Sequence, residues 1–102
     1  MLWKKLTIAA LGAGFGASLY ANSALADDPI HYCHWYAHTA IEQAHAARAV
    51  WPCHHFIDET PNRWTLDWGA HYDWCLSVFG SGANASEHQI RAENLNQCVN
   101  RM

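Results

Sequence analysis

Four cysteines constrain what this chain can fold into more than any other feature of the sequence. Their number is even, and no two of them form a Cys-x-x-Cys pair. This spacing argues against a thioredoxin-like redox motif, c-type haem attachment and the usual zinc-finger arrangement. An even count in a small exported chain is typical of structural disulfides. We therefore predict two disulfides, formed among Cys33, Cys53, Cys75 and Cys98.

The first 26 residues have the pattern of a secretory signal peptide. Lys4 and Lys5 precede an apolar run that extends from residue 6 to about residue 21, and Ala24-Leu25-Ala26 follows as a small-x-small cleavage signal. The run is short for a membrane span, which needs about 20 residues, and glycines interrupt it. We predict cleavage after Ala26. Residues 27–102 are then a single periplasmic or secreted domain with no stable membrane anchor.

The predicted mature domain is acidic and unusually rich in histidine. Its 76 residues contain four arginines, no lysine, nine acidic residues and eight histidines, so the net charge is −5 with neutral histidines. This balance argues against nucleic acid and anionic membrane surfaces as partners. Full protonation of the histidines would bring the charge to +3, and histidine titrates near about pH 6.5. A core this small usually needs additional stabilisation by covalent cross-links, which the disulfides supply.

The first predicted helix begins with Asp28 as N-cap and Pro29 at the first helical position. We expect it to continue to about Val50, because Pro52 disfavours helical geometry at the preceding residue. Seven residues fall on one stripe at about 100° per residue and form the expected core face. They are Cys33, Tyr36, Ala37, Ala40, Ala44, Ala47 and Trp51. Residues 53–64 are expected to form a loop.

Two further helices complete a predicted all-α fold, a small three-helix domain stapled by two disulfides. Thr65 or Asp67 caps the second helix, which runs to about residue 79 with Trp68, Tyr72, Cys75, Leu76 and Phe79 on its apolar face and His71 on the same side. Residues 80–84 form a turn. Ser86 and Gln89 make a capping box for the third helix, whose inner side is expected to hold Ile90, Asn94, Leu95, Cys98 and Met102.

Two disulfide pairings remain open. Cys33 and Cys53 lie about 30 Å apart along the first helix, so they cannot bond to each other. If the first and third helices are antiparallel, the pairs are Cys33–Cys98 and Cys53–Cys75. If they are parallel, the pairs are Cys33–Cys75 and Cys53–Cys98. We prefer the antiparallel arrangement.

The cysteines and several neighbouring residues resemble a group of small exported proteobacterial four-cysteine helical domains. The resemblance covers nearly the whole predicted mature chain and implies fold and compartment, without implying an activity. The sequence departs from the group at His54-His55-Phe56, where many members have a glycine-rich stretch, and the histidines of the first helix do not belong to the pattern. The matching positions are Cys33, Tyr36, Ala37, Ala40, Cys53, Trp64, His71, Trp74, Cys75, Leu76 and Cys98.

Histidines of the first helix form a polar stripe separate from its core face. His31, His34, His38 and His45 fall within an arc of about 60° on the helical wheel. Spacings of i, i+3 and i, i+4 allow two imidazoles on one helix to share a metal ion. Neutral imidazole suits Cu(II), Zn(II) and Ni(II). The predicted metal ligands are His31, His34 and His38, with His45, His54 and His55 as additional ligands.

The leading hypothesis is a non-enzymatic exported protein that binds a transition-metal ion for buffering or delivery. The alternative is a protein-interaction module or a pH-responsive, chaperone-like module, with Trp35 and Trp74 in an exposed patch for an exported partner. The histidines are also compatible with a solvated helix face without a function. His71 is expected to be a hydrogen-bonded core residue. No nucleophile stands beside a histidine and an acid in a recognisable pattern, so we do not expect an enzyme.

Overall fold

A computed structural model describes residues 28–101, and the predicted signal peptide lies outside this range. The chain divides into two units, Met1–Tyr32 and Cys33–Met102. The elements are α2 (Pro29–Ala49), the 3₁₀ helix η1 (Trp51–Cys53), α3 (His54–Glu59), α4 (Trp68–Ser77) and α5 (Ala83–Val99). Residues 28–101 contain no strand, and the predicted all-α fold is confirmed. No helix within this range has the length and apolar character needed to cross a membrane.

Helix α2 begins as the sequence predicts. The Asp28 carboxylate accepts hydrogen bonds from the backbone N–H groups of Ile30 (3.0 Å) and His31 (3.3 Å). The helix ends at Ala49, since Val50 adopts an extended conformation with φ −119° and ψ 109°. Six of the seven expected core residues are buried, namely Cys33, Tyr36, Ala37, Ala40, Ala44 and Ala47.

Trp51 contradicts the predicted core face, because its side chain is 80% exposed. The helical wheel places Trp51 on the core face only if the helix continues through Val50, and the extended backbone there turns the side chain away. The segment expected as a loop instead contains η1 and α3. Pro52 is accepted within the first turn of η1 because an N–H at that position has no helical partner.

An apolar cluster packs the end of α2 against the end of α5. It contains four fully buried residues, Ala47, Cys53, Trp64 and Cys98, and we call this set the apolar cluster. Four partly buried hydrophobic side chains surround it, those of Val50, Phe56, Ile57 and Leu95. Burial of apolar surface in this cluster stabilises the fold.

Helix α4 begins at Asp67, one of the two predicted caps, and buries only part of its predicted inner face. The Asp67 carboxylate accepts a hydrogen bond from the backbone N–H of Ala70 at 3.1 Å. Its two buried residues are His71 and Cys75. Trp68 and Leu76 are 37% and 38% exposed, so their expected place in the core is wrong. A helix of ten residues that is anchored by one disulfide covers only a narrow strip of its neighbours.

Helix α5 starts three residues before the predicted capping box. Its N-cap is Gly82, whose φ of 87° lies in the left-handed region that favours glycine, and Ser86 lies inside the helix. Of the expected inner side, Cys98 is buried and Leu95 packs against the apolar cluster, whereas Ile90 and Asn94 are only half-buried and Met102 lies outside the described residues. The buried residues are every seventh one, Asn84, Arg91 and Cys98. Because seven residues make nearly two helical turns, these three side chains form one straight line along the helix.

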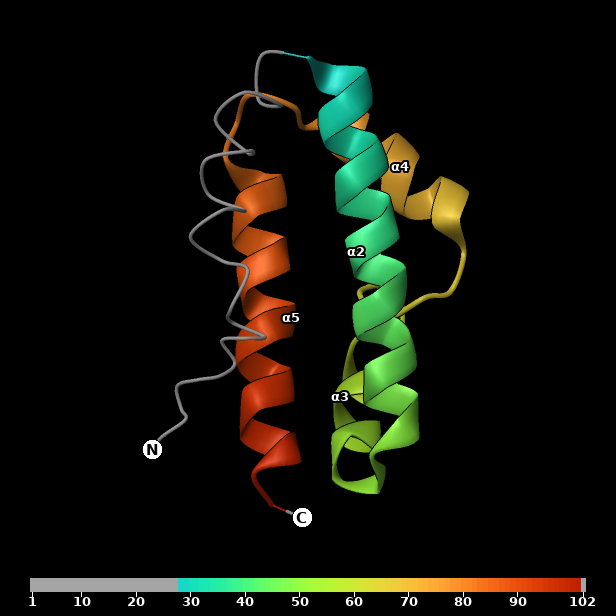
Figure 1. Ribbon diagram of the computed structural model, residues 1–102, viewed down its shortest axis with the longest axis vertical. Coiled ribbons are helices and arrows are strands. Elements are labelled where there is room, and N and C mark those ends of the chain that lie inside the picture. Colours follow the sequence, from blue (N-terminus) through green and yellow to red (C-terminus); the bar gives the residue numbers. More distant parts are fainter. Residues whose placement is uncertain (1–27, 102) are drawn as a thin grey trace. The chain divides into compact units, whose positions relative to one another are not determined.

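The disulfides join Cys33 to Cys75 and Cys53 to Cys98, with Cα–Cα distances of 5.6 and 5.0 Å. The preferred pairing of Cys33 with Cys98 and Cys53 with Cys75 is therefore wrong, and the parallel alternative is correct. From Cys33 onward, α2 and α5 run in the same direction (Figure 1). The segment with α3 and α4 carries the chain back along α2 before α5 begins. Both disulfides indicate an oxidising, extracytoplasmic environment.

Candidate functional site

Each histidine predicted on α2 has its own surroundings. The His34 ring packs edge-on against Trp68 and Tyr72, with ring centroids 5.0 and 5.3 Å away. The two aromatic rings of α4 are themselves stacked with centroids 4.9 Å apart. His34 therefore takes part in an aromatic contact between α2 and α4, which restricts the directions in which its imidazole can point.

The neighbouring histidines of the stripe are paired with carboxylates. His31 Nδ1 lies 3.1 Å from Asp28 Oδ2, and His38 Nε2 lies 3.3 Å from Glu42 Oε2. His45 is exposed. Across residues 28–101, no group of three or more His, Cys, Asp and Glu side chains is arranged to hold a metal ion. The stripe is thus a set of separate surface side chains, and metal binding by it stays a prediction.

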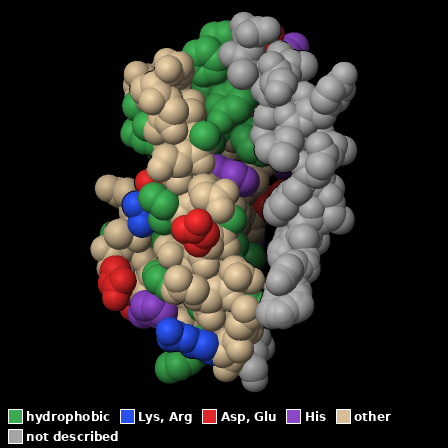
Figure 2. All heavy atoms as spheres, turned by 90° about the vertical axis from the view of Figure 1, so that its left-hand side faces the viewer, with side chains coloured by type: hydrophobic (Ala, Val, Ile, Leu, Met, Phe, Trp, Pro, Cys, Tyr) green, Lys and Arg blue, Asp and Glu red, His purple; other side chains and the backbone are tan. Residues whose placement is uncertain are grey.

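The two remaining predicted ligands, His54 and His55, line a hollow next to the end of α2. It has a volume of about 620 Å³. Its lining residues are Trp51, Pro52, His54, His55, Asp58 and Arg101, and we call it the histidine hollow. Figure 2 shows histidine, basic, acidic and hydrophobic side chains next to one another at the lower end of one face of the molecule.

Backbone carbonyl groups fix the protonation pattern of both imidazoles in the histidine hollow. His54 Nε2 lies 2.9 Å from the Arg48 carbonyl oxygen, and His55 Nδ1 lies 3.0 Å from the Pro52 carbonyl oxygen. A carbonyl oxygen only accepts, so each of these ring nitrogens carries the hydrogen. In the neutral imidazoles, His54 Nδ1 and His55 Nε2 then hold the lone pairs. Asp58 is four residues after His54 and three after His55, spacings at which side chains are neighbours on a helix.

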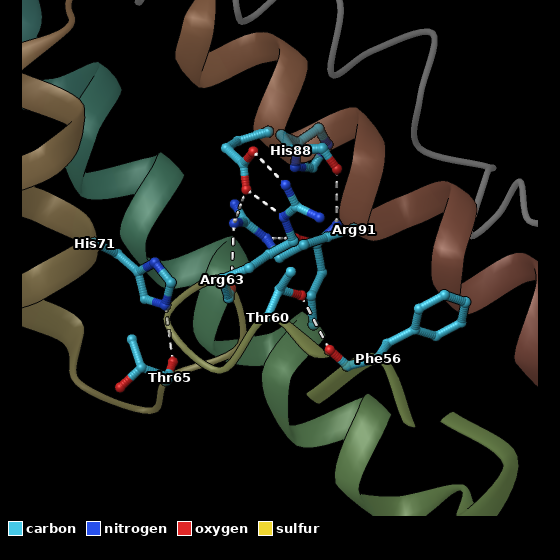
Figure 3. A network of polar contacts seen from close by, with 9 residues as sticks. Phe56, Thr60, Arg63, Thr65, His71, His88 and Arg91 are labelled. Carbon is cyan, nitrogen blue, oxygen red and sulfur yellow. Dashed lines mark hydrogen bonds and ion pairs between the residues drawn. The ribbon is translucent and has the colours of Figure 1, made fainter. Parts of the chain in front are cut away.

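A second group of polar side chains connects the 60–67 segment to α5 and α2. Arg63 donates two hydrogen bonds to the Glu87 carboxylate, at 2.7 and 3.0 Å. Arg91 Nη1 lies 3.8 Å from the same carboxylate, and Arg91 Nε donates to Gln43 Oε1 at 2.7 Å. Figure 3 shows the guanidinium groups of Arg63 and Arg91 close together. We call these four residues, Gln43, Arg63, Glu87 and Arg91, the arginine network.

The arginine network borders a second hollow of about 770 Å³, which we call the arginine hollow. His71 and Trp74 of α4 and Tyr36 of α2 also line it. The Tyr36 and Trp74 rings lie 5.8 Å apart, and the Arg91 guanidinium carbon lies 5.1 Å from the centre of the Tyr36 ring. Burial raises the pKa of Tyr36, an effect that the neighbouring Arg91 opposes.

Two histidines near the arginine network have a pKa below the ordinary value. Burial lowers the pKa of His71, although its Nε2 donates a hydrogen bond to the Thr65 carbonyl at 2.8 Å, which acts in the opposite direction. The prediction that His71 is a hydrogen-bonded core residue agrees with this geometry. Burial also lowers the pKa of His88, and the positive charge of Arg91 lowers it further. His88 packs against Trp35, with ring centroids 5.1 Å apart.

Sequence reasoning missed the arginine network. Arg91 is 1% exposed, and nothing in the composition marks it as buried. One signal was present, because Arg91 stands exactly seven residues before Cys98 and so shares its side of a helix. Comparisons with protein-family models, with curated proteins and with solved structures found no match. The candidate sites therefore depend on the geometry of this chain alone.

Proposed function

We propose that the protein is a periplasmic or secreted, non-enzymatic metal-binding protein that takes up a late transition-metal ion at the histidine hollow, for buffering or delivery. The observation that carries this proposal is the pair of carbonyl contacts to His54 and His55. Metal-binding histidines usually donate their second ring N–H to a carbonyl or carboxylate, which orients the ring and fixes the lone pair. Both imidazoles of this hollow have that arrangement.

Asp58 is the candidate oxygen ligand for this pair. Like the stripe, His54, His55 and Asp58 are not gathered around a metal position in residues 28–101, so the proposal requires their side chains to rotate. Side chains at i and i+1 of a helix do not face each other. His54 and His55 can therefore bind one ion only together with a third ligand that lies within reach of both. Asp58 has the helical spacing to meet either one, and it lines the same hollow. Waters complete the coordination of a Cu(II), Zn(II) or Ni(II) ion, all of which accept imidazole and oxygen ligands.

The stripe on α2 is a weaker candidate for the same ion. His38 already contacts Glu42, and His34 is packed against two aromatic rings, so both have competing interactions. In the histidine hollow, the His55 ring lies against Phe56 with ring centroids 4.0 Å apart, but Asp58 is exposed and both imidazoles are oriented by carbonyl groups. Ordering the exposed side chains costs roughly 0.5–1.5 kcal/mol each, which lowers the affinity that the ligands would otherwise give.

Calorimetric titration of the oxidised, tag-free protein with Cu(II), Zn(II) and Ni(II) tests the proposal. The variant His54→Gln/His55→Gln should lose at least about tenfold in affinity, and His34→Gln/His38→Gln is the matched control that should bind as the parent does. Cu(II) should also quench the fluorescence of Trp51, which lines the hollow. The proposal fails if no ion binds more tightly than about 100 μM, or if the control loses binding while the hollow variant keeps it.

A further inference from the structure

His38 and Glu42 place two atoms that can bind a metal ion side by side on the exposed face of α2. His38 Nε2 lies 3.3 Å from Glu42 Oε2, and the two side chains are 72% and 67% exposed. Two ligand atoms of one tetrahedral zinc ion lie about 3.3–3.4 Å apart, because each bond is about 2.0–2.1 Å long. The pair therefore already has the spacing of two neighbouring zinc ligands.

One chain does not complete this site. Zinc sites in proteins have three or four protein ligands, and no third His, Cys, Asp or Glu side chain joins the pair within residues 28–101. The next histidine along α2 is His45, seven residues after His38 and therefore about 10 Å further along the helix. Imidazoles this far apart on one helix do not reach the same ion. The missing ligand has to come from another molecule.

A second copy of this chain can supply that ligand. His38, Glu42 and His45 stand at i, i+4 and i+7, so they share one side of α2, and His45 is exposed. Suppose that two copies of α2 lie antiparallel, with a twofold axis between positions 41 and 42. Position 38 of one helix is then opposite position 45 of the other, because both are three and a half residues from the axis. The symmetry gives two identical sites, each with three protein ligands.

The charge and size of the side chains on this part of α2 permit such a pairing. Between positions 34 and 49 the only acidic residue is Glu42 and the only lysine or arginine is Arg48. Arg48 donates hydrogen bonds to two backbone carbonyl groups of its own chain. One zinc ion at each Glu42 offsets the repulsion between the two carboxylates. Ala46 and Ala49 are exposed and small, so a second helix can approach closely.

We propose that zinc ions link two copies of this chain, with each ion bound by His38 and Glu42 of one copy and His45 of the other. A water molecule takes the fourth position. The site is separate from the histidine hollow and shares no residue with it. Since two copies must meet, mass action leaves the site empty at the low protein concentration of a titration of the histidine hollow.

Sedimentation velocity of the oxidised, tag-free protein with zinc chloride tests the proposal. Zinc should convert the protein into a dimer, and EDTA should reverse the change. His38→Gln, Glu42→Gln and His45→Gln should each raise the dissociation constant of the dimer at least about tenfold. His31→Gln is the matched control, because His31 also lies on α2, is 70% exposed and contacts a carboxylate at 3.1 Å. This control should dimerise as the parent does.

Mixing two variants tests whether the ligands come from different copies. A heterodimer of His38→Gln with His45→Gln keeps one complete site, formed by His38 and Glu42 of the second variant and His45 of the first. The equimolar mixture should therefore dimerise with zinc at least about tenfold more tightly than either variant alone. The variant His54→Gln/His55→Gln should dimerise as the parent does, so failure of the histidine hollow would not imitate failure of this site.

Three results would overturn the proposal. The first is that zinc does not dimerise the parent protein at about 0.5 mM. The second is that His38→Gln or His45→Gln dimerises as tightly as the parent. The third is that the mixture dimerises no better than the separate variants, which would mean that His45 is not contributed by the other copy.

Discussion

The apolar cluster and the arginine network both tie α5 to α2 and to the 60–67 segment, but by different means. The apolar cluster consists of an alanine, a tryptophan and a disulfide that are fully buried. The arginine network holds the same elements with charged hydrogen bonds. Each region contains one buried donor without a partner within residues 28–101, the Trp64 indole N–H in the apolar cluster and Arg91 Nη2 in the arginine network. The two regions therefore differ in the charge of the groups that they bury.

The two regions differ in how their buried groups are satisfied. Apolar contacts depend on shape and burial, and in the apolar cluster they are satisfied by the chain itself. Charged groups need partners of opposite sign, and the arginine network supplies one carboxylate for two guanidinium groups. We infer that the apolar cluster stabilises the fold through burial alone, whereas the contribution of the arginine network depends on how its charges are paired.

The largest effect is expected in the apolar cluster. Trp64→Ala should destabilise the protein by about 4 kcal/mol, because it removes a fully buried indole and leaves a cavity. Thermal unfolding followed by circular dichroism should show a melting temperature lower by about 20 °C. Trp64→Phe should cost only about 1 kcal/mol, since the lost indole N–H has no hydrogen-bond partner in the described residues. Equal losses for both variants would contradict this account of the cluster.

A smaller effect is expected in the arginine network. Glu87→Gln should cost about 2 kcal/mol, because it leaves Arg63 and the buried Arg91 without their shared carboxylate, while partial exposure of Glu87 moderates the loss. Arg91→Met should cost less than about 1 kcal/mol, as removing the whole charged group also removes the unpaired donor. Urea unfolding at pH 7.5 measures both. A larger loss for Arg91→Met would mean that its hydrogen bond to Gln43 outweighs the charge imbalance.

Local signals in the sequence predicted the helices well and their packing less well. The caps at Asp28 and Asp67 depend on residues within three positions of each other, and both were found. The alanine face of α2 was also found, because a regular helix preserves its periodicity. The pairing of the cysteines was wrong because it depends on how the 50–82 segment returns along α2, which no local pattern encodes.

Predicting the candidate sites from the sequence was harder, because they depend on tertiary structure. The histidine composition pointed to metal binding, but it could not distinguish the stripe from His54 and His55, whose carbonyl partners become visible only in three dimensions. Arg91 is buried because α2, α5 and the 60–67 segment enclose it, so its isolated position in the sequence carried little information. Residues whose role comes from neighbours on other elements are the ones that sequence reasoning missed.

Acidification should lower the free energy of unfolding through two histidines near the arginine network. Burial lowers the pKa of His71 and of His88 in the folded protein, so the unfolded chain binds protons first as the pH falls. Stability should be highest above the ordinary histidine pKa of about 6.5 and should fall below it, until the folded protein also takes up the protons. Urea unfolding between about pH 7.5 and 5.5 measures this slope. His71→Gln/His88→Gln should flatten it, and an unchanged slope would exclude these two histidines as its cause.

The smallest effect is expected at the tryptophan that the helical wheel placed in the core. Trp51→Ala should change the free energy of unfolding by less than about 0.5 kcal/mol, because the side chain is 80% exposed and stands outside the apolar cluster. The contrast with Trp64→Ala compares two tryptophans that lie thirteen residues apart on either side of α3. A loss approaching that of Trp64→Ala would show that Trp51 packs in the core after all. Unchanged stability together with reduced Cu(II) quenching would assign Trp51 to the surface of the histidine hollow.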